Sequence, residues 1–130
     1  MSTDRESASD EQRIAAANAY IEALVTHQAD AVPFAPDCVR IELGVKTGFS
    51  GDHLRRSLNN GPQFRIISAA SDRQFRVEGD DVIASFVIET KPRVAGWRVA
   101  AKVDETFKIP ADDPRIHHIR ASFGPKLIRA

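Results

Sequence analysis

The chain has 130 residues, enough for one domain and too few for two ordinary ones. Lys plus Arg and Asp plus Glu number 18 each, so the formal net charge is zero, without the positive field that a general nucleic-acid binder needs. With 42% hydrophobic and 28% charged residues the chain is not disordered, and no apolar run approaches the ~20 residues of a membrane span. We therefore expect no nucleic acid and no membrane as partner.

The first nine residues, 1–9, predict a flexible tail ahead of a single domain formed by residues 10–130, because they are rich in Ser and acidic side chains and poor in apolar ones. No basic and then apolar leader opens the sequence, so we expect a cytoplasmic protein. Cys38 is the only cysteine, which excludes an internal disulfide and a multi-cysteine metal site. The histidines show no ligand spacing either, and we expect no metal and no cofactor.

A long amphipathic helix is predicted next. Ser9 and Gln12 have the spacing of a capping box, and apolar residues then recur at helical spacing to a predicted end near Gln28. Pro33 and Pro36 predict a turn after the helix.

Strands dominate the rest of the chain. A short helix over 52–58 interrupts them, and Glu78-Gly79-Asp80-Asp81 predicts a hairpin turn. The predicted strands are 38–43, 64–77, 82–90, 97–109 and 116–123. This order predicts an α+β fold: a curved antiparallel sheet wrapped around the long N-terminal helix, forming a conical barrel with an internal pocket.

Three polar residues are candidates for chemistry. Tyr20 lies on the apolar stripe of the first helix, as an ordinary core aromatic or as a phenol aimed into the pocket. Glu42, near the end of the first strand, is either an edge residue in water or a pocket acid. Asp104 is unusual in mid-strand, and strict alternation places it with Lys102 on a solvated face.

Four segments resemble the Δ5-3-ketosteroid isomerases: Tyr20–Leu24, Phe34–Glu42, Val103–Lys108 and Ile119–Leu127. Together they cover nearly the whole chain, from about residue 12 to 127. The wider cone-fold superfamily of nuclear-transport-factor-like and SnoaL-like proteins shares much of this layout.

The resemblance implies a mechanism and a partner. Glu42 falls at the position of the general base, and Tyr20 and a protonated Asp104 would donate hydrogen bonds to the enolate oxygen. The implied reaction is a cofactor-independent isomerisation of a hydrophobic ketone, such as a steroid or a polyketide, by a homodimer. An Asp stays protonated only in an apolar site, so Asp104 would have to turn inward, for example through a β-bulge between Ala100 and Val103.

The sequence departs from that family at several positions. Glu42 is one methylene longer than the usual Asp, and Leu43 replaces the Pro that commonly follows the base. Phe34 and Leu58 stand where some members carry supporting tyrosines. We expect five apolar side chains to line the pocket: Phe34, Leu58, Phe86, Trp97 and Phe107.

Two alternatives to an isomerase stay open. The pocket could hold an apolar ligand without catalysis, or the domain could serve to bind a partner, dimerising through the outer face of the sheet. Epoxide hydrolysis within the same superfamily needs an Arg–Asp–Asp relay. Lys102 and Asp104 supply only part of it, and Ala121 stands where the second Asp is expected, so the sequence argues against that chemistry.

Overall fold

The computed structural model describes residues 7–129, and residues 1–6 of the expected tail lie outside the described residues. Within 7–129, no helix is long and apolar enough to cross a membrane. The elements in chain order are α1 (Asp10–Thr26), β1 (Phe34–Glu42), β2 (Val45–Gly48), α2 (Gly51–Asn60), a 3-10 turn η1 (Pro62–Phe64), β3 (Ile67–Glu78), β4 (Asp81–Val94), β5 (Trp97–Lys108) and β6 (Ile116–Arg129).

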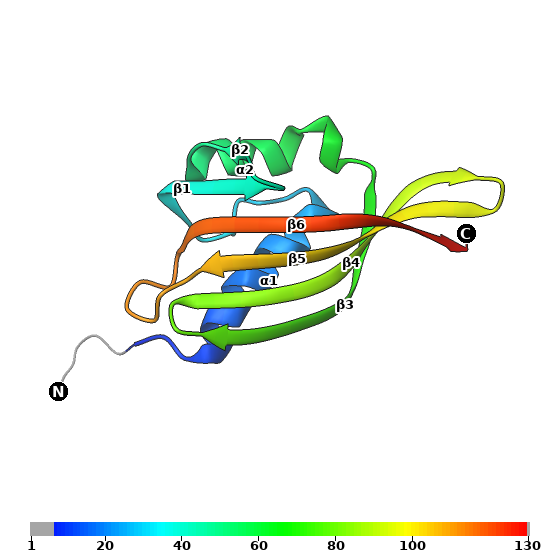
Figure 1. The fold of residues 1–130 in the computed structure, drawn as a ribbon. Coiled ribbons are helices and arrows are strands. Elements are labelled where there is room, and N and C mark those ends of the chain that lie inside the picture. Colours follow the sequence, from blue (N-terminus) through cyan, green and yellow to red (C-terminus); the bar gives the residue numbers. More distant parts are fainter. Residues whose placement is uncertain (1–6, 130) are drawn as a thin grey trace.

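The predicted α+β class is confirmed, with two corrections to the sheet. Its strand order is β2-β1-β6-β5-β4-β3, and the curved sheet stays open instead of closing into a barrel (Figure 1). The sheet is also mixed, because β1 pairs in parallel with β6 while every other neighbouring pair is antiparallel. The parallel pairing arises because the chain returns to β1 only with its last strand.

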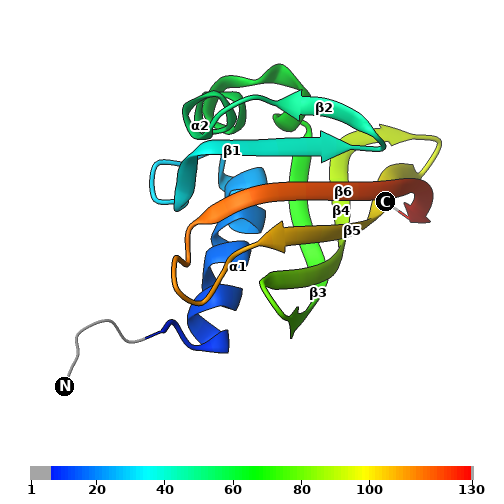
Figure 2. The same cartoon turned by 60° about the vertical axis from the view of Figure 1, so that its left-hand side comes forward.

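Helix α1 lies in the hollow of this sheet. Figure 2 shows the strands curling around it. The predicted capping box is present: Ser9 accepts from the backbone of Gln12, and the Gln12 side chain accepts from the backbone of Ser9. The face of α1 that carries Tyr20, Ile21 and Leu24 is buried against the sheet. A helix with one apolar stripe is stable here because the concave face of the sheet covers that stripe.

The first two strands correct the predicted turn at Pro36. β1 already begins at Phe34, and its pairing with β6 is irregular between Phe34 and Val39, where Pro36 offers no N–H. The chain then reverses through the two-residue turn Leu43–Gly44, both of which have positive φ. Glu42 is therefore the last residue of β1, held at a tight turn.

The buried side chain of Arg13 ties α1 to the far ends of the strands. Its Nε donates to the carbonyl of Ile109 and its Nη2 to the carbonyl of Gly79, both at 2.6 Å. Arg13 also forms an ion pair with Asp10, one turn earlier. One guanidinium thus satisfies two strand-end carbonyls, which fixes where the helix crosses the sheet.

We expect Arg13→Met to lower the free energy of unfolding by about 2–4 kcal/mol, because two carbonyl groups lose a charged donor. The matched control is Arg76→Met, which removes an exposed arginine paired with Glu78 and should change stability by less than about 0.5 kcal/mol. Urea denaturation of both variants measures the difference. Equal effects of the two substitutions on the free energy of unfolding would show that the Arg13 hydrogen bonds do not stabilise the fold.

Candidate functional site

A cavity of about 330 Å³ lies between α1, η1 and the concave face of the sheet. Its polar lining comes from residues far apart in sequence: Tyr20, Arg40, Glu42, Thr47, Gln63 and Glu105. The remaining lining is almost entirely apolar. Polar groups gathered in an otherwise apolar cavity are typical of a small-molecule site.

Two acids face each other across the sheet in this cavity. Glu42 on β1 is in register with Ala121 on β6, and Ala121 is in register with Glu105 on β5. The Cα atoms of the two glutamates are therefore two strand spacings apart, about 10 Å. Ala121 between them is too small to fill the gap, so the row leaves space for a ligand between the acids.

Arg40 is the central cation of the site and is only 1% exposed. Its Nε and Nη2 donate to the hydroxyl and the carbonyl of Thr47, at 3.0 and 3.2 Å, and its Nη1 donates to the hydroxyl of Tyr20 at 3.1 Å. The guanidinium also lies over the ring of Phe64 and 3.7 Å from the Glu42 carboxylate. Each of the three guanidinium nitrogens thus donates a hydrogen bond, as a buried cation requires.

The Tyr20 hydroxyl is oriented by Arg40. Since it accepts a hydrogen bond from Arg40, its own proton must point elsewhere, and none of the hydrogen bonds among residues 7–129 uses that proton. Burial and the nearby Glu105 raise the Tyr20 pKa well above its usual value, so the phenol stays neutral. Phe34 and Phe107 hold the ring edge-on. Tyr20 can therefore donate into the cavity.

Glu105 differs from Glu42 in its surroundings. It is 3% exposed, whereas the side chain of Glu42 is 25% exposed and lies beside Arg40. Burial, reinforced by the charge of Glu42, raises the pKa of Glu105 to about 8, although Arg40 opposes the shift. Near neutral pH the cavity thus holds one carboxylate, one protonated carboxylic acid and one guanidinium.

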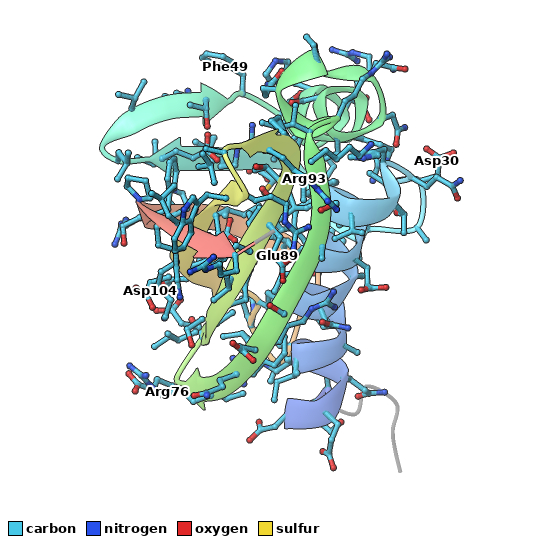
Figure 3. All side chains as sticks on the ribbon, turned by 90° about the vertical axis from the view of Figure 1, so that its right-hand side faces the viewer. Asp30, Phe49, Arg76, Glu89, Arg93 and Asp104 are labelled. Carbon is cyan, nitrogen blue, oxygen red and sulfur yellow. The ribbon has the colours of Figure 1, made fainter. Side chains whose placement is uncertain are left out.

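Asp104 does not lie in the cavity, which corrects the expectation that it would turn inward. Its side chain is 64% exposed and lies 3.6 Å from the Lys102 ammonium. Figure 3 shows Asp104 on the side of the sheet away from α1. The register of β5 with both neighbours runs without a shift from Ala100 to Lys108, so no bulge re-aims the residue. The solvent-facing position expected from strict alternation is confirmed.

The prediction of the pocket walls is wrong, because none of the five expected apolar residues lines the cavity. Phe34, Leu58, Phe86 and Phe107 are buried in the core behind the cavity. Trp97 lies at the outer end of β5, exposed, with the Arg129 guanidinium over its ring. The apolar lining comes mainly from Phe64, Ile66, Ile67, Ile88, Val103 and Phe123.

Arg40 and Glu105 are the site residues that the sequence interpretation missed. Glu105 lies two residues from both Val103 and Phe107, so its side chain points to the same face of β5 as theirs. Alternation alone therefore indicated that Glu105 faces the core. In the same way, Arg40 and Glu42 are two residues apart on β1, so their side chains point to the same face of the sheet. Within the part of the chain that the structure describes, no three His, Cys, Asp or Glu side chains are grouped to hold a metal ion.

The model of a protein family described as "Domain of unknown function (DUF8021)" matches residues 6–123. The chain belongs to this family. A comparison with curated proteins gave no match.

Several solved structures share this fold. An LEH-like epoxide hydrolase of M. tuberculosis is similar at a TM-score of 0.68 and 19% identity, over 88% of this chain and 84% of the other. A protein of the SnoaL-like family from Agrobacterium tumefaciens is similar at a TM-score of 0.63 and 11% identity, over 88% of this chain and 98% of the other. An NTF2-like protein from Burkholderia xenovorans is similar at a TM-score of 0.66 and 11% identity, over 89% of this chain and 92% of the other. The chain therefore has the fold of these NTF2-like and SnoaL-like proteins.

The raised pKa of Glu105 makes stability depend on pH. Its pKa of about 8 in the folded state lies above the usual glutamate pKa of 4.5, so the folded chain holds a proton that the unfolded chain releases between these limits. Stability therefore falls as the pH rises from about 4.5 to 8. We expect Glu105→Gln to be more stable than the parent protein at pH 8 by on the order of 3–4 kcal/mol, with little difference at pH 4.5.

Urea unfolding at several pH values tests this expectation, with Glu78→Gln as the control because Glu78 is exposed and paired with Arg76. A difference between the parent and Glu105→Gln that stays constant with pH would contradict a protonated Glu105.

Proposed function

We propose that residues 10–130 act as a single-domain enzyme of the ketosteroid isomerase type, which moves a proton between two carbons of a hydrophobic ketone without a cofactor. Glu42 is the base, and Tyr20 and protonated Glu105 are the hydrogen-bond donors to the ketone oxygen. The observation that carries the proposal is one cavity with a carboxylate, a phenol and a buried neutral carboxylic acid.

Each group has a defined task in this reaction. The Glu42 carboxylate removes a proton from the carbon next to the carbonyl, and the electron pair moves to the carbonyl oxygen. Tyr20 and Glu105 donate to that oxygen, where negative charge develops in the transition state. Protonated Glu42 then returns the proton to the distal carbon of the conjugated system, which restores the carboxylate and completes the isomerisation.

Glu105 takes the role that the family resemblance implied for Asp104. A donor to an enolate oxygen has to be protonated and dry. Glu105 is buried with its pKa raised, while Asp104 forms an ion pair in solvent. The role therefore moves by one residue along β5, to the other face of the strand.

A second reaction is favoured by the position of Arg40 near two acids. Glu42 could accept a proton from water, whose oxygen attacks one carbon of an epoxide, while Glu105 supplies the proton to the alkoxide released as the C–O bond breaks. Arg40 lies 3.7 Å from the Glu42 carboxylate and would hold it in place. Ala121 still lacks the acid expected from the epoxide hydrolases, but Glu105 on the neighbouring strand offers one from another position.

The proposal extends to location and assembly. A chain with zero net charge and an apolar cavity suits a hydrophobic small molecule and not a nucleic acid. We place it in the cytoplasm as a homodimer that pairs through the outer face of the sheet, leaving the concave face free for the substrate.

Turnover of a 3-oxo-Δ5-steroid and of the smaller cyclohex-3-enone tests the reaction. We expect Glu42→Gln to lower kcat by about 10²–10⁴-fold, since it removes the base. Tyr20→Phe is expected to lower kcat by about 10²–10³-fold, since it removes one donor to the oxyanion. Asp104→Asn is the matched control and should leave turnover within about twofold of the parent, because surface substitutions away from the site have small effects.

Parallel assays with styrene oxide separate the two reactions. Diol formation that depends on Glu42, without ketone isomerisation, would replace the isomerase by a hydrolase. Tight binding of a phenol without turnover of either substrate class would leave a non-catalytic binding domain.

The pH dependence of isomerisation follows from Glu105. It donates only while protonated, so we expect kcat to fall as the pH rises through about 8. Glu105→Gln keeps an N–H donor that does not titrate, and its pH–rate profile should stay flat there. An unchanged alkaline decline in Glu105→Gln would remove Glu105 from the mechanism.

A further inference from the structure

An apolar surface continues from the cavity onto the open end of the sheet. Its exposed members are Trp97 and Val99 on β5 and Phe123 and Leu127 on β6, which we call the apolar shelf. They are 38%, 47%, 43% and 63% exposed, respectively. The β4–β5 hairpin and the end of β6, which carry the shelf, project beyond the two helices (Figure 1). Four large exposed apolar residues on one face need an explanation.

The register of the strands places the shelf on the same face as the two acids. Val103 is opposite Phe123 and Val99 is opposite Leu127. Both pairs point to the same face of the sheet as Glu105. Phe123 belongs to both regions, since it lines the cavity and is exposed. On this face of β5, the exposed fraction of the residue rises from 4% at Val103 to 47% at Val99. The floor of the cavity therefore becomes the shelf without a break.

The shelf carries no charge between Glu105 and Trp97, and its outer end is covered by the Arg129 guanidinium over the Trp97 ring. Between Glu105 and Trp97, the inward-facing residues of β5 are Val103, Ala101 and Val99. The facing residues of β6 are Phe123, Pro125 and Leu127. A polar or charged group of a ligand that lies on these residues would lack a hydrogen-bond or ionic partner among them. An apolar chain would instead remove exposed apolar surface from water.

The cavity itself is small for the proposed substrate class. Its volume of about 330 Å³ is at the lower end of the ~300–1,000 Å³ found for drug-sized ligands, so it encloses one or two rings and leaves the rest of a larger ligand outside. Past Phe123, the apolar lining of the cavity continues onto the shelf.

We propose that the apolar shelf is the binding subsite for a long alkyl or isoprenoid tail of the substrate, whose ketone head enters the cavity. This inference rests on the proposed function for the identity of the head group. It narrows the substrate class from hydrophobic ketones in general to elongated ones with an apolar tail. Trp97 and Arg129 mark the outer end of the subsite.

The length of the shelf sets the expected dependence on the tail. Phe123 and Leu127 are four residues apart, about 14 Å along the strand. An extended chain advances about 1.2 Å per bond, as a peptide backbone does, so the shelf accommodates roughly a dozen chain carbons. Full burial of a methylene corresponds to about fourfold in affinity, and a chain covered on one side should gain about twofold for each methylene.

A series of 4-alkylphenols, from phenol to 4-octylphenol, tests the proposal. The phenol mimics the enolate oxygen at Tyr20 and Glu105, and the tail points along the shelf. We expect Kd to fall about twofold for each methylene. Trp97 is the only tryptophan of the chain, so its emission reports on the shelf directly. The long-chain phenols should shift it to shorter wavelength, and phenol itself should not.

Variants then separate the shelf from general hydrophobic binding. Val99→Asp and Leu127→Asp place a charge on the shelf and should reduce the ratio of the phenol Kd to the 4-octylphenol Kd by at least about tenfold, because the tail then lies against a charged group. The matched control is Leu43→Asp. It adds the same charge at an exposed leucine of the β1–β2 turn and should keep the ratio of the parent protein.

The outcomes distinguish the two proposals. Weak binding of phenol, with a normal dependence on chain length, would count against the oxyanion site and leave the shelf supported. A Kd independent of chain length, or one whose dependence survives Leu127→Asp, would overturn the shelf. A lower oligomer mass of Leu127→Asp in light scattering would also overturn it, because a second copy of the chain would then occupy this face.

Discussion

The buried guanidinium of Arg40 is the constraint on which the site depends. It joins α1 through Tyr20, β2 through Thr47, η1 through Phe64 and β1 through Glu42. A buried charge is tolerated only when its donors are satisfied, so these four elements must keep their relative positions as long as the arginine stays inside. The packing of the cone and the orientation of the polar groups in the cavity are therefore set by the same contacts.

The two acids near this guanidinium differ because they are buried to different extents. Glu42 is nearest to the cation and open to solvent, while Glu105 is fully enclosed and carries the desolvation penalty. Two residues of the same type thus differ through their surroundings, because burial raises the pKa of Glu105 while the Glu42 side chain is partly exposed beside Arg40.

The sequence predicted the elements better than it predicted the site. The capping box at Ser9, the hairpin after Glu78 and the positions of Tyr20 and Glu42 on their elements follow from local patterns, which the structure retains. The inward acid did not follow, because the resemblance pointed to Asp104 although alternation pointed away from it. Arg40 was missed because a charged residue inside a strand is normally expected in solvent, and only the tertiary structure brings its partners together. Trp97 was misplaced because β5 is longer than the core that covers it.

Ala121 gives the site a way to change without losing its chemistry. The distance between Glu42 and Glu105 is determined by backbone spacing, and Ala121 contributes little more than the floor between them. A larger residue at this position would raise that floor and shorten the accessible part of a ligand, with both acids left in register. A single central strand position can therefore set the size of ligand that the cavity admits, independently of the positions of Glu42 and Glu105.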